Sequence, residues 1–199
     1  MESQAGSATG GQTTTEPVCE QGAVTVRLRE LNTSDAEQAR RWRNDERIWR
    51  WCRQNDFISD LNQRDWFNAQ HADRTIKMYA IEVDSNEFKN VFVGVCGLTD
   101  ICHVHSRAEF SLYVSPESQG KGIGRAALHA LLKHGFMNLN LRQIWGEVFD
   151  GNPAMKTFLD IGFEETGHRP EFYFKDGKYL CAHLITLFRD SDKGRAICS

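Results

Sequence analysis

The sequence predicts an α/β fold with a mixed, mostly antiparallel central sheet flanked by helices. Residues 109–114 alternate apolar and polar side chains, which is the period of two shown by a strand buried on one face. In residues 125–139 the apolar side chains instead recur at helical spacing. The predicted elements run β-α-α-α-β-β-β-α-β-α-β-β along the chain. Strands joined without a helical crossover pair antiparallel, whereas strands that flank a helix can be parallel.

Composition limits the function classes. The chain has 199 residues, 40% of them hydrophobic, which is enough to bury the core of one domain. A formal net charge of -3 gives no global basic field for nucleic acid or for an anionic membrane surface. The sequence has no apolar run of about 18 residues, and its polar N-terminus lacks the apolar segment of a secretory signal. We therefore expect a cytosolic protein whose six cysteines, none in a C-x-x-C pair, are free thiols.

Three segments are expected along the chain. Residues 1–22 are rich in Gly, Ser, Thr and Gln and cannot bury enough apolar surface to offset the entropy of ordering, so they are predicted to be a flexible tail. Residues 23–189 should form the folded domain, followed by a polar tail at 190–199. The predicted strands are 23–28, 77–83, 91–98, 108–114, 143–149, 172–174 and 179–188. The predicted helices are a stretch from 36 that breaks near 44, then 62–71, 125–139 and 152–161.

Glycine and capping residues indicate where some of these elements bend or begin. Thr33 or Ser34 can cap the helix that starts near residue 36. Gly94 and Gly97 lie within one strand and predict a bulge or a close approach of two backbones. The pair Asp176-Gly177 predicts a tight turn that joins the last two strands in a hairpin.

A tract rich in arginine and tryptophan follows the first helix. Its arginines alternate with aromatic rings over residues 40–53, which is the composition of a surface that stacks on nucleic-acid bases. The alternative is two short helices whose tryptophans face the core or a substrate cleft and whose arginines are solvated or paired with Asp45 and Glu46. Because the chain is acidic overall, we favour the second interpretation.

The segment between the central strand and the long helix has the features of an anion site. Gly120, Gly122 and Gly124 alternate there with Lys121, Ile123 and Arg125. The first N–H groups of a helix have no partner within the helix, and glycines let the backbone approach a ligand closely. A phosphate or pyrophosphate is the expected ligand.

The spacing within this segment distinguishes between phosphate-binding motifs. It contains no Gly-Lys-Ser/Thr run as in a P-loop, and Arg125 stands where the dinucleotide fingerprint needs glycine. The pattern Gln119-x-x-Gly122-x-Gly124 resembles the pyrophosphate-binding motif of the GNAT family of acetyl-CoA-dependent N-acetyltransferases. The stretches EVFDGNPAMKTFLDIGF and RLRELNTSDAEQARRWRND also resemble that family, in the branch with ribosomal-protein N-terminal, spermidine and amino-sugar acetyltransferases. The similarity covers residues 24–188.

The resemblance implies acetyl-CoA as co-substrate and assigns its contacts. Backbone pairing with pantetheine maps to Leu112, Tyr113 and Val114. Pyrophosphate contacts map to Gln119, Gly120, Lys121, Gly122, Ile123, Gly124 and Arg125. The asparagine of the later signature, which often contacts the cofactor arm, maps to Asn152.

Acetyl transfer to an amine requires the neutral amine, which suggests a catalytic carboxylate. A lysine-like amine has a pKa near 10.4, so neutralising it at pH 7 costs about 4–5 kcal/mol. Glu109, on the central strand just before the cofactor contacts, is the candidate base that removes the proton directly or through water. Glu147 on the next predicted strand is the second candidate, and an ordinary salt-bridge glutamate is the alternative for either.

The departing thiolate has no evident general acid. Many relatives place a tyrosine in the helix after the asparagine signature, where this chain has Phe158, which cannot donate a proton. Tyr113, Tyr173, Ser115 or water can substitute, or no acid is needed because a thiol of pKa near 8.5 leaves readily. We expect a backbone N–H of the central strand, that of Val114, to hold the oxyanion.

One cluster of histidines and cysteines has the composition of a metal site, but the sequence does not predict one. His103 and His105 would share one face if Val104 lay in a strand, with Cys96 and Cys102 nearby. The set lacks standard zinc spacing, and the segment has the character of a surface connection.

The predicted function is therefore transfer of an acetyl group to a primary amine of a small molecule of the amino-sugar or polyamine class. Acetylation of a protein N-terminus is the alternative of the same chemistry, and acyl-CoA binding without turnover is the alternative of another class. No nucleic-acid or membrane partner is expected. The resemblance implies a homodimer.

Overall fold

The computed structural model describes residues 18–21, 24–84 and 90–199. Its strands are β1 Val18–Gln21, β2 Val24–Glu30, β3 Lys77–Asp84, β4 Val91–Cys102, β5 Arg107–Val114, β6 Gln143–Phe149, β7 Glu164–Lys175 and β8 Lys178–Phe188. Its helices are α1 Ala36–Arg43, α2 Glu46–Trp49, α3 Asp60–Ala72, α4 Ile123–Met137, α5 Met155–Ile161 and α6 Asp192–Cys198. Two short 3-10 turns, Thr33–Asp35 and Pro116–Ser118, complete the set.

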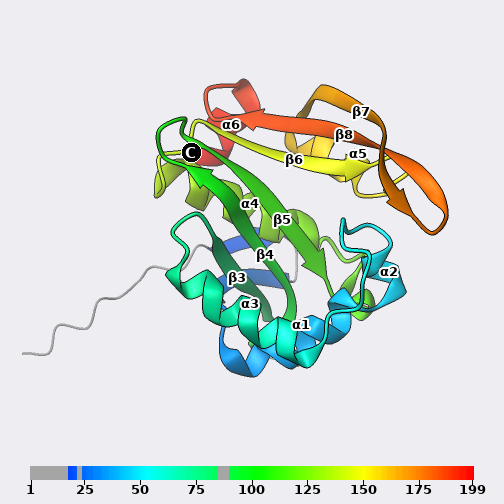
Figure 1. The fold of residues 1–199 in the computed structure, drawn as a ribbon. Coiled ribbons are helices and arrows are strands. Elements are labelled where there is room, and N and C mark those ends of the chain that lie inside the picture. The colour runs from blue at the N-terminus through cyan, green and yellow to red at the C-terminus, as the bar shows by residue number, and fades with distance from the viewer. Residues whose placement is uncertain (1–17, 22–23, 85–89) are drawn as a thin grey trace, which may run out of the picture.

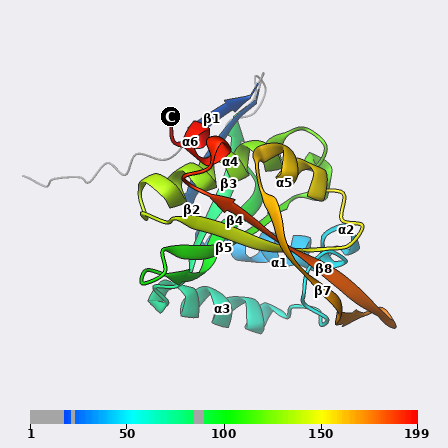
Figure 2. The same cartoon turned by 90° about the horizontal axis from the view of Figure 1, so that it is seen from above.

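The described strands form one sheet in the order β1-β2-β3-β4-β5-β6-β8-β7. The β5–β6 pair is parallel and the other neighbouring pairs are antiparallel. Figure 1 shows the sheet with its helices, and Figure 2 shows α4 on one side of it and α1 and α3 on the other. The predicted mixed, mostly antiparallel α/β fold is thus confirmed.

Two apolar layers hold the helices to the sheet. Leu128, Leu131 and Leu132 of α4 are fully buried in the larger core, which also takes in Ile81 and Leu98 of the sheet. The smaller core, on the opposite side, joins α1 and α3 to β3 and β4 through Leu31, Ala39, Phe67, Ala80 and Val95. Both layers follow from side chains that alternate across each strand, so the two sides of β5 face different surroundings.

Glycines in β4 allow two strands to approach closely, as predicted. A Cβ at Gly94 would lie 2.5 Å from the carbonyl oxygen of Tyr113, and one at Gly97 would lie 2.4 Å from that of Lys77. The β3–β4 register shifts between Ile81 and Glu82, which is the irregularity that these glycines indicated.

β5 and β6 pair over only three residues. The register matches Arg107 to Gln143, Ala108 to Ile144 and Glu109 to Trp145, and it ends there. Beyond this point β5 follows β4 as far as Val114, while β6 follows β8. The two strands therefore splay apart directly after Glu109, as the diverging ribbons in Figure 1 show.

Both ends of the chain hold more structure than the sequence suggested. Residues 18–21, placed in the expected tail, form β1 and pair with β2, whereas residues 1–17 and 22–23 lie outside the described residues. The expected polar tail contains α6, whose Ile197 is 4% exposed and belongs to the larger core. One large aliphatic side chain, flanked only by the small residues Ala196 and Cys198, carries too weak a periodic signal to predict such a short helix.

Candidate active site

The loop after β5 presents backbone N–H groups at the start of α4. Gly120 and Gly122 have φ of 75° and 78°, and a Cβ at either would meet nothing within 4 Å. The cap residue Gly122 has no side chain that could accept from these N–H groups, and the first turn of α4 holds no acidic residue. The first helical bond runs from the N–H of Ala126 to the carbonyl oxygen of Gly122. Earlier N–H groups of this turn are thus available to an anion.

Side chains hold this loop in place from both sides. Gln119 Nε2 donates to the carbonyl oxygen of Val114 at 3.2 Å, and Lys121 Nζ donates to that of Glu117 at 2.9 Å. Ile123 is buried in the larger core, whereas the Arg125 side chain is exposed beside the loop. The seven predicted pyrophosphate contacts, 119–125, therefore lie in one continuous loop and helix start.

The splayed edge of β5 carries unpaired main-chain groups. The N–H of Ser115 donates to the carbonyl oxygen of Val93 on β4 at 2.6 Å. Because successive residues of a strand point their N–H and C=O groups to opposite edges, those of Val114 and Leu112 face the splay. The carbonyl of Tyr113 points instead toward Gly94 of β4, and the Tyr113 side chain packs against the smaller core. Of the three predicted pantetheine contacts, Leu112 presents its N–H and C=O groups at the free edge, and Val114 presents its N–H there while its carbonyl oxygen accepts from Gln119.

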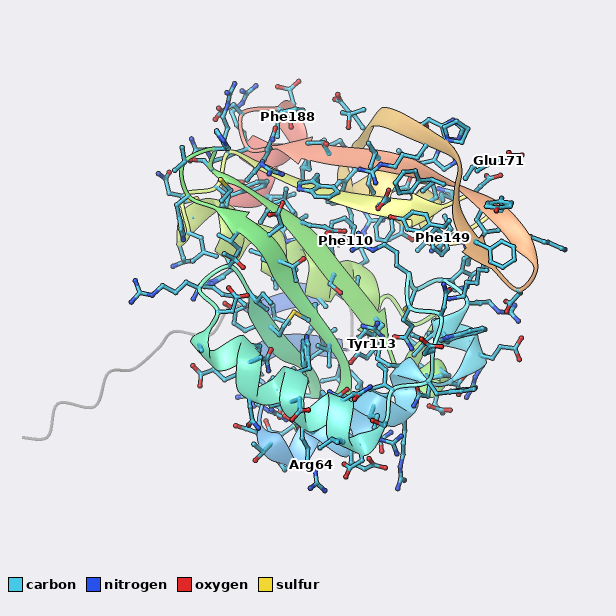
Figure 3. All side chains as sticks on the ribbon, in the orientation of Figure 1. Arg64, Phe110, Tyr113, Phe149, Glu171 and Phe188 are labelled. Atoms are coloured by element: carbon cyan, nitrogen blue, oxygen red, sulfur yellow. The ribbon has the colours of Figure 1, made fainter. Side chains whose placement is uncertain are left out.

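The end of β6 supplies the other wall of the splay. Phe110 lies over Gly146, where a Cβ would approach the Phe110 ring to 2.3 Å, and it contacts Phe158 with ring centroids 5.2 Å apart. Figure 3 shows Phe110 and Phe149 on the two diverging strands. Asn152 turns the chain into α5, with its Oδ1 accepting from the N–H of Ala154 at 2.9 Å. Phe158 is 8% exposed and lies in the apolar core.

Glu109 and Glu147 face each other across the point where the strands part. Arg53, from the segment between α2 and α3, places Nη2 2.6 Å from Glu109 Oε1 and Nη1 3.3 Å from Glu147 Oε2. Tyr173 of β7 donates its hydroxyl to Glu147 Oε2 at 2.5 Å. Arg169 Nη1 lies 3.2 Å from Glu147 Oε1. Two carboxylates and two guanidiniums thus form one network.

The two glutamates differ in access. The Glu147 side chain is 2% exposed, and its oxygens face Arg53, Tyr173 and Arg169. Glu109 is 11% exposed, and its Oε2 accepts no hydrogen bond from the described part of the chain. Burial raises the pKa of Glu109 above its ordinary value, against the opposing effect of Arg53. Glu109 is therefore a stronger base than a solvated glutamate, and it has a free oxygen.

Lys175 clamps the segment that carries Arg53. Its Nζ donates to the carbonyl oxygens of Trp49, Cys52 and Gln54 at 2.7, 2.6 and 2.8 Å, and it lies 4.1 Å from the centre of the Trp49 ring. The residue is 5% exposed, and burial lowers the pKa of its ammonium. The β7–β8 hairpin is therefore fixed to the α2–α3 segment, and Figure 1 shows its tip beside α2.

Replacing Lys175 with methionine should reduce the free energy of unfolding by about 2–4 kcal/mol, because three carbonyl groups lose a charged donor. Urea unfolding measures this loss. Lys178→Met is the matched control, since Lys178 is exposed on the same hairpin. Equal stability of the two variants would show that the Lys175 contacts do not hold the hairpin.

The remaining predicted features have clear positions. In the arginine-rich tract Arg47 pairs with Asp45 and Arg50 with Glu46, both at 2.6 Å, in agreement with the favoured interpretation.

His103 and His105 lie in an exposed turn between β4 and β5 rather than in a strand. Among residues 18–21, 24–84 and 90–199, no three His, Cys, Asp or Glu side chains are grouped so as to hold a metal ion. No helix in these ranges is both long and apolar enough to cross a membrane.

Sequence reasoning missed Arg53, Arg169 and Lys175. Arg53 is one of several similar arginines in its tract, and its partner Glu109 lies 56 positions away. Lys175 offered one weak signal, a single cation among the aromatic residues of the hairpin strand.

Comparison with known proteins decides the family. The model of the Acetyltransferase (GNAT) domain family matches residues 25–164, which is most of the chain. The chain belongs to the GNAT acetyltransferase family. This GNAT protein is an acetyl-CoA-dependent N-acetyltransferase, as the sequence predicted.

Relatives of this GNAT enzyme fall within the predicted branch. It is 27% identical over 168 residues to spermidine N(1)-acetyltransferase of Escherichia coli (strain K12), covering 84% of this chain and 88% of the relative. The Vibrio cholerae serotype O1 enzyme of the same name is 29% identical over 153 residues, covering 76% and 86%.

Solved structures agree with the fold. A crystal structure of Vibrio cholerae spermidine N-acetyltransferase in complex with CoA and spermine has a TM-score of 0.77 and 26% identity, covering 84% of this chain and 96% of that one. A dodecameric structure of the Vibrio cholerae enzyme has a TM-score of 0.71 and 26% identity, covering 85% and 95%.

Proposed function

We propose that this GNAT enzyme acetylates a primary amine of a polyamine such as spermidine, with Glu109 as general base. The observation that carries the catalytic assignment is the free oxygen of Glu109, buried at the point where β5 and β6 part. The relatives named for spermidine acetylation support the polyamine class.

Coenzyme A would lie along the splay. Free N–H groups of the loop 119–125 would bind the pyrophosphate, with the exposed cations of Lys121 and Arg125 nearby. The amides of pantetheine would pair with the main chain of Leu112 and Val114, as a further strand does. Asn152 keeps its Nδ2 group for the cofactor arm while its Oδ1 caps the turn into α5.

The nitrogen must lose two protons, and one bond is exchanged. The ammonium of the acceptor passes one proton to Glu109 through a water molecule, and the neutral nitrogen then attacks the thioester carbonyl carbon. The second proton leaves the nitrogen for solvent as the C–S bond breaks and the thiolate departs. Successive residues rise about 3.3 Å along a strand, so the N–H of Leu112 lies nearer to Glu109 than that of Val114. The oxyanion would accept from a free N–H of this edge, either that of Val114, as expected from the sequence, or that of Leu112.

The thiolate would leave without a protein acid. Phe158 has no donor, and Tyr173 already donates to Glu147. The Tyr113 side chain packs on the α1–α3 side of the sheet, where burial raises the pKa of its hydroxyl. A thiol of pKa near 8.5 forms a competent leaving group, which solvent protonates afterwards.

We also propose that the enzyme is cytosolic and forms a homo-oligomer. The described cysteines Cys52, Cys96, Cys102, Cys181 and Cys198 are free thiols, which suits a reducing cytosol. A dodecameric relative supports a homo-oligomer, larger than the dimer expected from the sequence.

Incubation of the purified protein with acetyl-CoA and a panel of spermidine, spermine, glucosamine and an unblocked peptide, analysed by mass spectrometry, tests the substrate class. We expect a mass increase of one acetyl group on spermidine and spermine. Modification of the peptide alone would favour N-terminal acetylation, and thermal stabilisation by CoA without any product would favour a binding module.

A further inference from the structure

Among the described contacts, Arg53 is the arginine of the arginine-rich tract that reaches the two buried glutamates. Its guanidinium bridges the buried carboxylates of Glu109 and Glu147, at 2.6 and 3.3 Å. Arg47 and Arg50, from the same tract, pair instead with exposed acids on their own segment. A cation therefore lies against the candidate base before any substrate arrives.

The contact is built into the fold. Lys175 bonds to carbonyl groups on both sides of Arg53 in sequence, those of Cys52 and Gln54. A buried ammonium is costly unless its hydrogen bonds are made, and here all of its donors hold the segment that carries Arg53. Such an arrangement fixes the backbone of a residue whose own side chain is half exposed.

The charged and titratable groups around Glu109 come from four other elements. They are Arg53 from the α2–α3 segment, Asp100 of β4, Glu147 of β6, and Tyr173 and Arg169 of β7. Asp100 pairs with Arg107 at 3.1 Å. The charges of the two glutamates are balanced by Arg53 and Arg169, so loss of Arg53 would leave an excess negative charge where the amine must lose its proton.

We propose that Arg53 is a specificity-determining residue that disfavours the ammonium form of the acceptor beside Glu109, and that Lys175 is the residue that positions it. A like charge nearby favours the neutral form of an amine. The proton lost by the nitrogen goes to the Glu109 carboxylate, which Arg53 also keeps ionised. This inference rests on the proposed role of Glu109, but not on the identity of the amine.

The test compares Arg53→Gln with Arg50→Gln, whose residue lies in the same tract away from the carboxylates. Initial rates with spermidine and with butan-1-amine are measured from pH 6 to 10, giving kcat and KM at each pH. Without Arg53 the bound ammonium is stabilised, and Glu109 loses the cation that lowers its pKa, so a higher pH is needed for the proton to pass from the nitrogen to the carboxylate. We expect the acid limb of kcat to move up by about one pH unit, kcat at pH 7 to fall about 10-fold, and KM to fall. Arg50→Gln should match the wild type.

Other outcomes overturn the proposal. An acid limb that stays in place would leave Arg53 a structural role only, and a rising KM would show that it binds an anionic group of the acceptor. Lys175→Met should move the acid limb in the same direction by a smaller amount, which loss of stability alone would not do. If the wild-type enzyme acetylates other amines of the panel but not spermidine, the polyamine proposal is wrong. The Arg53 proposal is then tested with the amine that the enzyme accepts, so the two proposals fail independently.

Discussion

Glu109→Gln is expected to lower kcat at least about 100-fold while leaving the dissociation constant for CoA unchanged. Glutamine keeps the size of the side chain and can still accept from Arg53, but it cannot take a proton from the amine. The splay and the loop that would hold CoA do not depend on this charge. Steady-state rates with spermidine and calorimetry with CoA measure the two quantities. Wild-type turnover should fall as the pH decreases through the pKa of Glu109, which burial raises above its ordinary value.

Two companion variants make this result specific. Glu164→Gln changes an exposed glutamate of β7 and should leave kcat unaltered. Glu147→Gln disturbs the contacts with Tyr173 and Arg53 and should lower kcat less than Glu109→Gln does. If Glu147→Gln abolished turnover and Glu109→Gln did not, the base would be Glu147.

Gly122→Asp should weaken CoA binding at least about 100-fold. Aspartate tolerates the left-handed backbone conformation better than most residues, so the loop should keep its shape. Its carboxylate would stand where we place the diphosphate, and two charges about 4 Å apart repel by roughly 4 kcal/mol at an effective dielectric constant near 20. Calorimetric titration with CoA gives the affinity.

The hairpin turn provides a control with nearly the same backbone. Gly177 has φ of 76°, and like Gly122 it has open space around its Cα. Gly177→Asp should therefore alter stability by a similar amount while CoA affinity stays at the wild-type value. Equal affinities in the two variants would place the diphosphate away from Gly122.

Local pattern sufficed for those parts of the site that are contiguous in the chain. The strand, glycine-rich turn and helix that end β5 and begin α4 lie within about 30 residues, and each has its own periodicity or turn signal. The sequence placed the loop correctly and the helix two residues too late, at 125–139 where the structure has Ile123–Met137. Gly94 likewise signalled a close approach whose partner strand lies elsewhere in the sequence.

Long-range pairings could not be obtained in this way. Arg53 meets Glu109, and Lys175 meets Gln54, only because the β7–β8 hairpin folds back over the segment after α2. Neither contact leaves a periodic trace, since each depends on one side chain of ordinary type. The early end of the β5–β6 pairing also leaves no signal in the sequence. Both strands keep apolar residues at alternating positions after the last paired residues, Glu109 and Trp145.

The brief pairing of β5 with β6 leaves two halves of a sheet joined by a short seam. The pantetheine arm of CoA, with its two amides, could pair between them as a short additional strand, so cofactor binding would complete the sheet as well as deliver the acetyl group. In the enzyme without CoA, the two halves of the sheet should then move relative to each other at this short pairing. Binding of CoA should hold them together, so that the sheet becomes continuous at the same step that prepares the enzyme for catalysis.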